Sequence, residues 1–281
     1  TQWYSTAEMH ELTELLRDGS KNVPLDVAAL QIATVEYPDL TPEPWLVLLD
    51  SHAAEFKDRI TERTSGDDFV SELNTYLFDE LGFGGNSESY YDAANSCLNE
   101  VLLRRSGIPI TLSIVYMEVA RRVGRKIRGV GLPGHFIVRY SDGDFEALLD
   151  PFHGGQVLSP EDCFTLAREA TGMDLPDDPA LLQPVTRRHI AIRMLNNLRA
   201  VYFQQSEPAK AVRVLDLLIE ASPETAAEEY KQRGVCGAQL GRLGAAQQDL
   251  KTYLRLAPGA PDRQQVMAEL ERLRRLEALR A

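Results

Sequence analysis

One stretch, residues 107–151, constrains the fold more than any other part of the chain. From residue 110 onward it is apolar on nearly every side until Arg121-Arg122, and this pattern is typical of a buried helix. Pro109 suits the first turn of that helix, because the N–H that proline lacks has no helical partner there. Two short apolar runs follow, as expected of β-strands. We therefore predict a central buried helix followed by a small antiparallel sheet.

An Asp-Gly pair, Asp142-Gly143, separates the two apolar runs. This dipeptide is a preferred two-residue loop of a β-hairpin, because both of its positions need a positive φ. With these residues as the loop, His135 lies directly opposite Asp150, and directly opposed side chains share one face. A shift of one residue would mix the apolar and polar faces, so the pattern itself favours this register. The sequence thus predicts an imidazole beside a carboxylate.

Amphipathic patterns predict further helices around this core. Five of them precede it, over residues 5–17, 24–37, 42–60, 67–81 and 89–105. Short strands are expected over residues 127–130 and 155–158, and Ser159-Pro160 is a strong start for one more helix. We therefore expect an α+β fold, in which a mostly helical N-terminal domain contains a small antiparallel sheet.

An internal repeat marks the C-terminal part of the chain. The spacing from Ala211 to Pro223 recurs from Ala246 to Pro258, and a period of about 34 residues is typical of tetratricopeptide repeats. A stretch rich in proline and acid, residues 174–184, is the best candidate for a linker. We therefore expect two domains, residues 1–180 and residues 181–281. The second is expected to be an all-α repeat domain that ends in a capping helix.

The composition is that of a soluble globular protein, because 44% of the residues are hydrophobic and 26% are charged. No apolar run is long enough to span a membrane, and the first residues lack the pattern of a signal peptide. The three cysteines are far apart and odd in number. We therefore expect no disulfide framework and a reducing, cytoplasmic location.

The charge is unevenly distributed. The net charge of −12 argues against a nucleic-acid partner. Residues 1–180 hold 14 basic and 31 acidic residues, whereas residues 181–281 hold 16 and 11, so the two parts can attract one another or the second can face an acidic partner. Eight basic residues gather around the central helix and hairpin: Arg104, Arg105, Arg121, Arg122, Arg125, Lys126, Arg128 and Arg139. They either complement and solvate helix ends or form an anion-binding rim.

Several motifs around the hairpin resemble those of a known family. They are Asn95-Ser96, Leu98, Arg104-Arg105, Gly107-Ile108-Pro109-Ile110, Gly131-Leu132-Pro133-Gly134-His135-Phe136, Asp150-Pro151-Phe152 and Gly154-Gly155. The chain resembles the transglutaminase-like superfamily, and within it the bacterial invasion-regulator-B ("Sir-B") family, whose members commonly carry tetratricopeptide repeats behind this core. The resemblance implies a transglutaminase- or cysteine-protease-like core with a Cys-His-Asp triad, its cysteine at the helix start. His135 and Asp150 match the second and third members, whereas the helix start here holds no cysteine.

The identity of a nucleophile is the open question at this site. Thr111 and Ser113 lie near the start of the central helix, and Cys97 is expected on the preceding helix. Each can act only with a base within reach. The simpler interpretation is that the two hydroxyls bond to backbone groups and that the thiol is inert core. His135 and Asp150 likewise form either a base held in one tautomer or a pair that only satisfies its own hydrogen bonds.

Other polar residues complete the set of candidates. We expect binding roles for six residues of the matched motifs and of the loop after the second strand: Asn95, Arg104, Arg105, Pro109, Gly134 and His153. Asn95 is equally a capping or packing group, and the two arginines are equally a solvated helix end. His153 can join the His135–Asp150 pair as a metal ligand, but the spacing matches no strong metal motif. We therefore expect no metal and no cofactor.

These observations predict a non-catalytic or regulatory protein-binding module, in which a degenerate transglutaminase-like domain has lost its nucleophile. The repeat domain would bind a protein or peptide partner, with no nucleic acid and no membrane involved. The alternative is an amide hydrolase or acyltransferase that uses the His135–Asp150 pair with one of the three nucleophile candidates. A metal-dependent enzyme built on this pair and His153 is the third hypothesis. The sequence sets no substrate, no particular partner and no oligomeric state.

Overall fold

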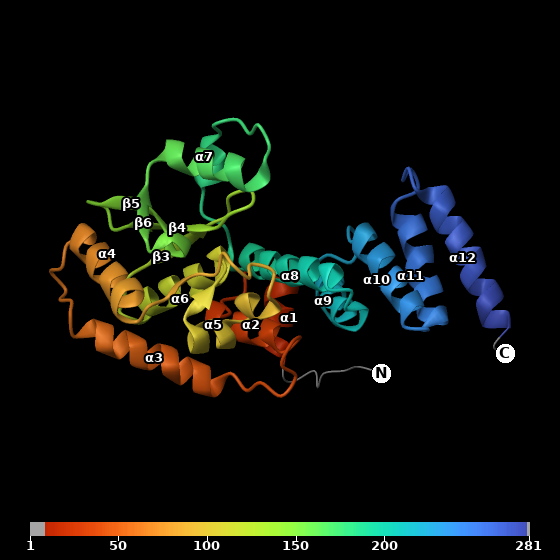
Figure 1. The fold of residues 1–281 in the computed structure, drawn as a ribbon, viewed down its shortest axis with the longest axis horizontal. Coiled ribbons are helices and arrows are strands. Elements are labelled where there is room, and N and C mark those ends of the chain that lie inside the picture. Colours follow the sequence, from red (N-terminus) through yellow and green to blue (C-terminus); the bar gives the residue numbers. More distant parts are fainter. Residues whose placement is uncertain (1–8, 280–281) are drawn as a thin grey trace. The chain divides into compact units, whose positions relative to one another are not determined.

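The computed structural model describes residues 9–279 (Figure 1). By its internal contacts the chain divides into two compact units. The site unit is residues 22–194, and the repeat unit is residues 195–279 together with residues 9–21. The division lies inside helix α8 (Arg187–Gln204), which is uninterrupted. The proline-rich segment expected as a linker, residues 174–184, precedes this division. Its last residue, Pro184, forms an antiparallel β-bridge with Val130 of the site unit.

Helix α1 (His10–Arg17) groups with the repeats although it is near the start of the chain. It packs against α9 (Pro208–Ala221), and Arg17 forms an ion pair with Glu220 of that helix. The expected start of α1, near residue 5, lies outside the described residues. The sequence pattern predicts the helix itself but carries no information about this distant partner.

The site unit has helices in all the predicted places. They are α2 (Leu25–Ala33), α3 (Glu43–Lys57), α4 (Gly66–Asn74), α5 (Leu98–Arg104), α6 (Pro109–Arg122) and α7 (Pro160–Thr171). Four of them end within a few residues of the prediction, whereas α4 and α5 are shorter than predicted. Helix α6 is the central one: its residues from Pro109 to Ala120 are all buried, and it packs on α2, α3 and the four-stranded sheet. Ser159 caps α7 by accepting a hydrogen bond from the Asp162 N–H at 3.2 Å.

Two of the predicted helices are interrupted. The helix expected over residues 67–81 changes after α4 into a π-helical segment, Thr75–Glu80. The helix expected over residues 89–105 is a 3₁₀ turn, Ala93–Ser96, followed by α5, with Cys97 extended between them at φ −104° and ψ 115°. The Asn95 carbonyl accepts a hydrogen bond from the Thr111 hydroxyl at 2.8 Å, and this bond takes the place of a helical N–H partner. The placement of Cys97 on a continuous helix is therefore wrong.

The sheet of the site unit has four antiparallel strands in the order of the chain. They are β3 (Ile127–Val130), β4 (Ile137–Ser141), β5 (Glu146–Asp150) and β6 (Gln156–Leu158). A second, parallel pair joins β1 (Gly84–Gly85) to β2 (Ser106–Gly107). Two-residue strands that contain glycine carry no alternating pattern, so the sequence does not predict this pair.

The register of the β4–β5 hairpin differs from the prediction by two residues. Val138 pairs with Leu149, and the loop residues are Gly143 and Asp144 rather than Asp142 and Gly143. Asp142 stays outside the loop because its carboxylate accepts the N–H groups of Asp144 and Phe145, at 3.3 and 3.0 Å. Of the two loop residues, only Gly143 has a positive φ, at 101°. A shift of two residues leaves both faces of each strand as predicted.

The sheet is covered on both faces. Ile137 and Leu148 pack with Val130, Leu132 and three residues of α7, namely Cys163, Phe164 and Ala167. The alternate residues of β4, which point to the opposite face, lie on the side where α6 packs on β3 and β4. This arrangement places the ends of β4 and β5 between two layers of helix, which is where the candidate site lies.

The repeat unit is wholly helical. Its remaining helices are α10 (Ala227–Gln239), α11 (Leu243–Leu256) and α12 (Arg263–Ala278). Neighbouring helices from α9 to α12 pack on one another. Gly234 allows α10 and α11 to approach closely, since a Cβ there would lie 3.0 Å from Cδ2 of Leu250. Within residues 9–279, no helix combines the length and the apolar character that crossing a membrane requires.

Candidate functional site

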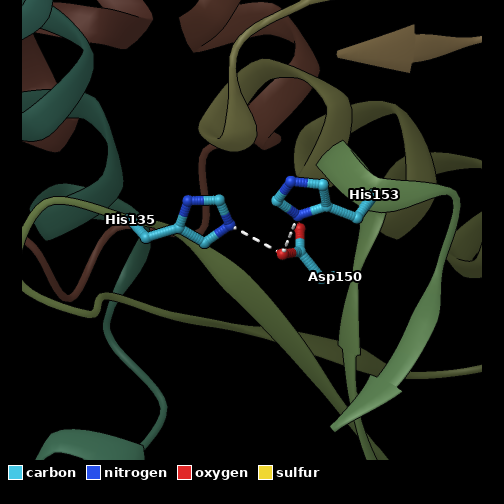
Figure 2. Close-up of side chains that lie close together, drawn as sticks. All are labelled: His135, Asp150 and His153. Carbon is cyan, nitrogen blue, oxygen red and sulfur yellow. Dashed lines mark hydrogen bonds and ion pairs between the residues drawn. The ribbon is translucent and has the colours of Figure 1, made fainter. Parts of the chain in front are cut away.

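Three side chains meet at the end of strand β5 and form the His–Asp–His cluster: His135, Asp150 and His153 (Figure 2). Nε2 of His135 lies 2.9 Å from Oδ2 of Asp150, and Nδ1 of His153 lies 2.8 Å from the same oxygen. The two imidazole rings are nearly parallel, with centroids 5.9 Å apart. His135 and Asp150 are buried, at 6% and 1% exposure, whereas the His153 side chain is half exposed. The sequence predicted the contact between the first two and offered His153 only as a weak metal ligand beside them; the structure places all three side chains together.

Backbone turns position these side chains. Asp150 ends β5, and its Oδ1 accepts the Phe152 N–H at 3.0 Å, which caps a single 3₁₀ turn, Pro151–His153. That turn brings the His153 ring against the Asp150 carboxylate, three residues earlier in the chain. His135 follows Gly134, whose φ is +71° and where a Cβ would lie 2.8 Å from Cβ of Ala170. Gly134 therefore acts through the backbone, since no other residue fits this turn without strain.

The charge state of Asp150 fixes the tautomers of both rings. Burial disfavours the charged carboxylate, but hydrogen bonds and charge from His135 and His153 outweigh it and lower the pKa of Asp150. An ionised carboxylate only accepts hydrogen bonds, so each imidazole donates an N–H to it. Nδ1 of His135 then carries the free lone pair when the ring is neutral. It makes no hydrogen bond among residues 9–279.

Within the described part of the chain, none of the predicted nucleophiles forms a hydrogen bond with Nδ1 of His135. Cys97 is fully buried, its Sγ donates to the Ala93 carbonyl at 3.4 Å, and burial raises the pKa of its thiol. Thr111 Oγ1 accepts the Ile108 N–H at 3.2 Å and so serves the start of α6, where Ile108 offers no side-chain acceptor. Ser113 is buried and its hydroxyl has no partner among the described residues.

The predicted binding residues of the N-terminal motifs form a separate polar network. Arg104 donates to Asn95 Oδ1 at 2.9 Å and to Asp92 Oδ2 at 3.0 Å. Arg105 donates to the Leu81 carbonyl at 2.9 Å, and Pro109 is the first residue of α6. Within residues 9–279 no hydrogen bond joins this network to the His–Asp–His cluster. Arg104 thus links side chains within residues 92–104, and Arg105 binds the backbone at Leu81.

The cluster also has the donor set of a metal site. One ligand atom from each of its three residues lies within 4.8 Å of the others, and two imidazoles with a carboxylate suit zinc or iron. The two nitrogens, however, lie at hydrogen-bond distance from a single carboxylate oxygen. Holding a metal ion would require both nitrogens to give up the protons that they share with Asp150. The arrangement is therefore first a hydrogen-bonded cluster.

Two residues next to His135 were missed by reasoning from the sequence. The Phe152 ring meets the His135 ring edge to face, with centroids 5.9 Å apart. Arg193 donates to the His135 carbonyl at 2.6 Å and its guanidinium lies over the Phe136 ring. Arg193 belongs to a helix that reads as the start of the repeats, so no local pattern connects it to the hairpin.

Comparison with known proteins agrees with this architecture. Residues 43–196 match the family described as the transglutaminase-like superfamily, and residues 198–271 match the tetratricopeptide repeat. These matches confirm the core and the repeats that the sequence motifs indicated.

Whole-chain relatives are similar along most of their length. The chain is 39% identical over 241 residues to a UPF0162 protein of Xylella fastidiosa, and the match covers 85% of each protein. It is 30% identical over 230 residues to a UPF0162 protein of Pseudomonas aeruginosa, covering 82% of this chain and 83% of the relative. A shorter match, 33% identical over 138 residues, links 46% of this chain to 21% of human F-box only protein 21. The chain therefore belongs to the UPF0162 family, and it joins a transglutaminase-like domain to tetratricopeptide repeats.

Proposed function

We propose that this chain is a non-catalytic, regulatory protein-binding module built on a transglutaminase-like domain that keeps a His–Asp pair and lacks its nucleophile. One observation carries the proposal: within residues 9–279, no hydroxyl or thiol forms a hydrogen bond with the His135 ring. Covalent acyl transfer needs an activated nucleophile within reach of its base. Without one, the cluster holds the hairpin end in shape and the repeats supply the binding surface.

The repeat unit offers apolar side chains to a protein partner. Phe203 of α8, Val235 of α10 and Met267 of α12 are 41%, 44% and 48% exposed. Large apolar side chains left in water are a common mark of a protein-binding surface when they recur on successive repeats. We propose a protein or peptide segment as the partner, held by these alternate helices.

We further propose a bacterial, cytoplasmic protein of the invasion-regulator-B group. The motifs from Asn95 to Gly155 support the family, and the three free cysteines suit a reducing compartment.

Photo-crosslinking tests the binding surface. A photoreactive amino acid placed at Val235 or Met267 of the full chain is expected to give discrete adducts in cells, because a bound partner would cover these positions. Val47, which is 65% exposed on α3 in the site unit, is the matched control. Adducts of equal yield at all three positions, or none at Val235 and Met267, would contradict the assignment to the repeats.

The alternative function is an amide hydrolase or acyltransferase. It is favoured by the 2.9 Å contact between His135 and Asp150, which leaves Nδ1 of His135 as a base of fixed orientation. The nucleophile would then have to be Cys97, Thr111 or Ser113 after a rearrangement of the helix starts.

Activity-probe labelling separates the two functions. The wild type, His135→Gln and the surface control His189→Gln are expected to react equally with thiol-directed and fluorophosphonate probes, since no group is activated by His135. The folded state of each variant is checked by circular dichroism. Labelling that is lost in His135→Gln and kept in His189→Gln would sink the non-catalytic proposal and support the alternative.

A further inference from the structure

Two arginines face each other directly across the β3–β4 pair of the site unit. Arg128 of β3 is the register partner of Arg139 of β4. Directly opposed residues on antiparallel strands share a face at close range, and like charges there are destabilising. Lys126 lies just before the strand and lines the same hollow as the two arginines. Three cations therefore gather on one small area.

The positive charge of these three side chains is only partly neutralised by acidic residues. Arg139 forms an ion pair with Glu146 at 2.6 Å. The side chains of Lys126 and Arg128 form no hydrogen bond or ion pair with the residues that the structure describes. Their charge is available to a ligand.

The three cations line a hollow of about 330 Å³. Its other walls are Ser141, Gln183 and Pro184. The Ser141 hydroxyl and the Gln183 amide also make no side-chain hydrogen bond among residues 9–279. Every polar side chain of this hollow can therefore donate a hydrogen bond, and none of them is acidic. This is the donor set that recognises a phosphate group.

Two simpler explanations of the cations do not cover these three. Charges often guard an open sheet edge, but the outer edge of β3 is occupied: the Val185 N–H donates to the Gly129 carbonyl at 2.9 Å. Charges also complement helix ends, and Arg121 and Arg122 do so in the last turn of α6. Lys126, Arg128 and Arg139 lie beyond that helix.

A larger hollow of about 640 Å³ adjoins the first, and the two share Lys126, Arg128 and Pro184. It adds three more basic side chains, Arg121, Arg125 and Arg187, and apolar walls that include Met117, Val185 and Ile190. Glu118 is the acid that lines it. An apolar group attached to a phosphate would find contact there.

We propose that this face of the site unit binds a phosphate monoester. The phosphate contacts Lys126, Arg128 and Arg139, and the organic group enters the larger hollow. The ester is either a free small molecule or a phosphorylated side chain, and both present the same chemistry. The site does not depend on the His–Asp–His cluster or on the repeats.

Isothermal titration of the full chain at low ionic strength tests the proposal. Phenyl phosphate is expected to bind one to one and more tightly than inorganic phosphate, since only the ester fills both hollows. Arg128→Thr is expected to weaken phenyl phosphate by at least about tenfold, because it removes a charged hydrogen-bond donor. Arg63→Thr is the matched control, as Arg63 is exposed on the same unit and its side chain has no partner among the described residues. A phosphotyrosine peptide that binds more tightly than phenyl phosphate assigns the ester to a partner protein, and the reverse order assigns it to a small molecule.

Thermal unfolding gives a second test. If Arg128 had only a structural role, replacing it would not change the shift in melting temperature that phenyl phosphate causes. Without phosphate, Arg128→Thr is expected to unfold at the wild-type temperature or above it, because the opposed charges are gone. Phenyl phosphate is expected to raise the melting temperature of the wild type and of Arg63→Thr, and to raise that of Arg128→Thr by clearly less. Absence of saturable binding to the wild type would overturn the proposal, as would equal affinities of the Arg128 and Arg63 variants.

Discussion

Replacing Arg122 by methionine is expected to lower the free energy of unfolding by about 3–5 kcal/mol, which is typical of breaking a buried ion pair from one side. The guanidinium donates to Asp26 at 2.6 Å, to Glu118 at 2.8 Å and to the exposed Asp50 at 2.6 Å. Asp26 and Glu118 are 1% and 3% exposed. Methionine preserves most of the volume but leaves these two buried carboxylates with the half-exposed Arg121 as their remaining counter-charge.

The loss is expected to depend on pH. The pKa of Glu118 is raised, because burial and the Asp26 charge disfavour its ionised form more than Arg121 and Arg122 favour it. A carboxyl whose pKa is higher in the folded protein stabilises the fold less as the pH rises through that folded value. Removing Arg122 strengthens this effect, so the destabilisation should be larger at about pH 7.5 than at about pH 5.

Urea unfolding of the wild type, Arg122→Met and Arg63→Met at both pH values measures the loss of unfolding free energy and its dependence on pH. The exposed Arg63 variant controls for the loss of a surface charge. A midpoint of Arg122→Met that equals that of Arg63→Met, or a loss that grows as the pH falls, would contradict the buried ion cluster.

Replacing Gly155 by alanine is expected to cost about 2–5 kcal/mol, the sum of a left-handed backbone and a steric overlap. Gly155 has a φ of +75°, and a Cβ there would lie 2.1 Å from Oδ1 of Asn74. Asn74 has no free room to retreat, because its amide donates to the Gly155 carbonyl at 2.9 Å and its Oδ1 accepts the Tyr116 hydroxyl at 2.9 Å.

Gly154→Ala is the matched control. Gly154 has a φ of +69°, but nothing lies within 4 Å of its Cβ position. It is expected to cost only the backbone strain, about 1–2 kcal/mol. Calorimetric melting of both variants isolates the overlap as the difference between them, and equal stabilities would show that Asn74 does not confine Gly155.

The sequence predicted those parts of the fold that depend on local patterns. The central helix α6 and the strands of the hairpin follow from apolar periodicity, which needs no knowledge of distant residues. The contact between His135 and Asp150 was also expected, although the register behind that expectation was off by two residues. It survives because an even shift keeps both residues on one face, and the imidazole of His135, which precedes β4, is long enough to reach the carboxylate diagonally.

The features that were missed depend on contacts between distant residues. The extended Cys97 depends on the Thr111 hydroxyl, which bonds to the Asn95 carbonyl from another helix. Arg193 reaches the His135 carbonyl from 58 residues away. His153 was expected only as a binding residue or a weak metal ligand, because nothing in the sequence shows that a 3₁₀ turn will place it against Asp150. Local propensity and residue spacing do not predict such contacts.

The shared acceptor at Asp150 makes the hydrogen bonds of the His–Asp–His cluster redundant. Two rings and one backbone N–H donate to the same carboxylate, so a variant that lacks either ring leaves the buried anion with two donors. The hairpin end is therefore expected to stay folded when His153 is replaced, because His135 and the Phe152 N–H still donate to Asp150.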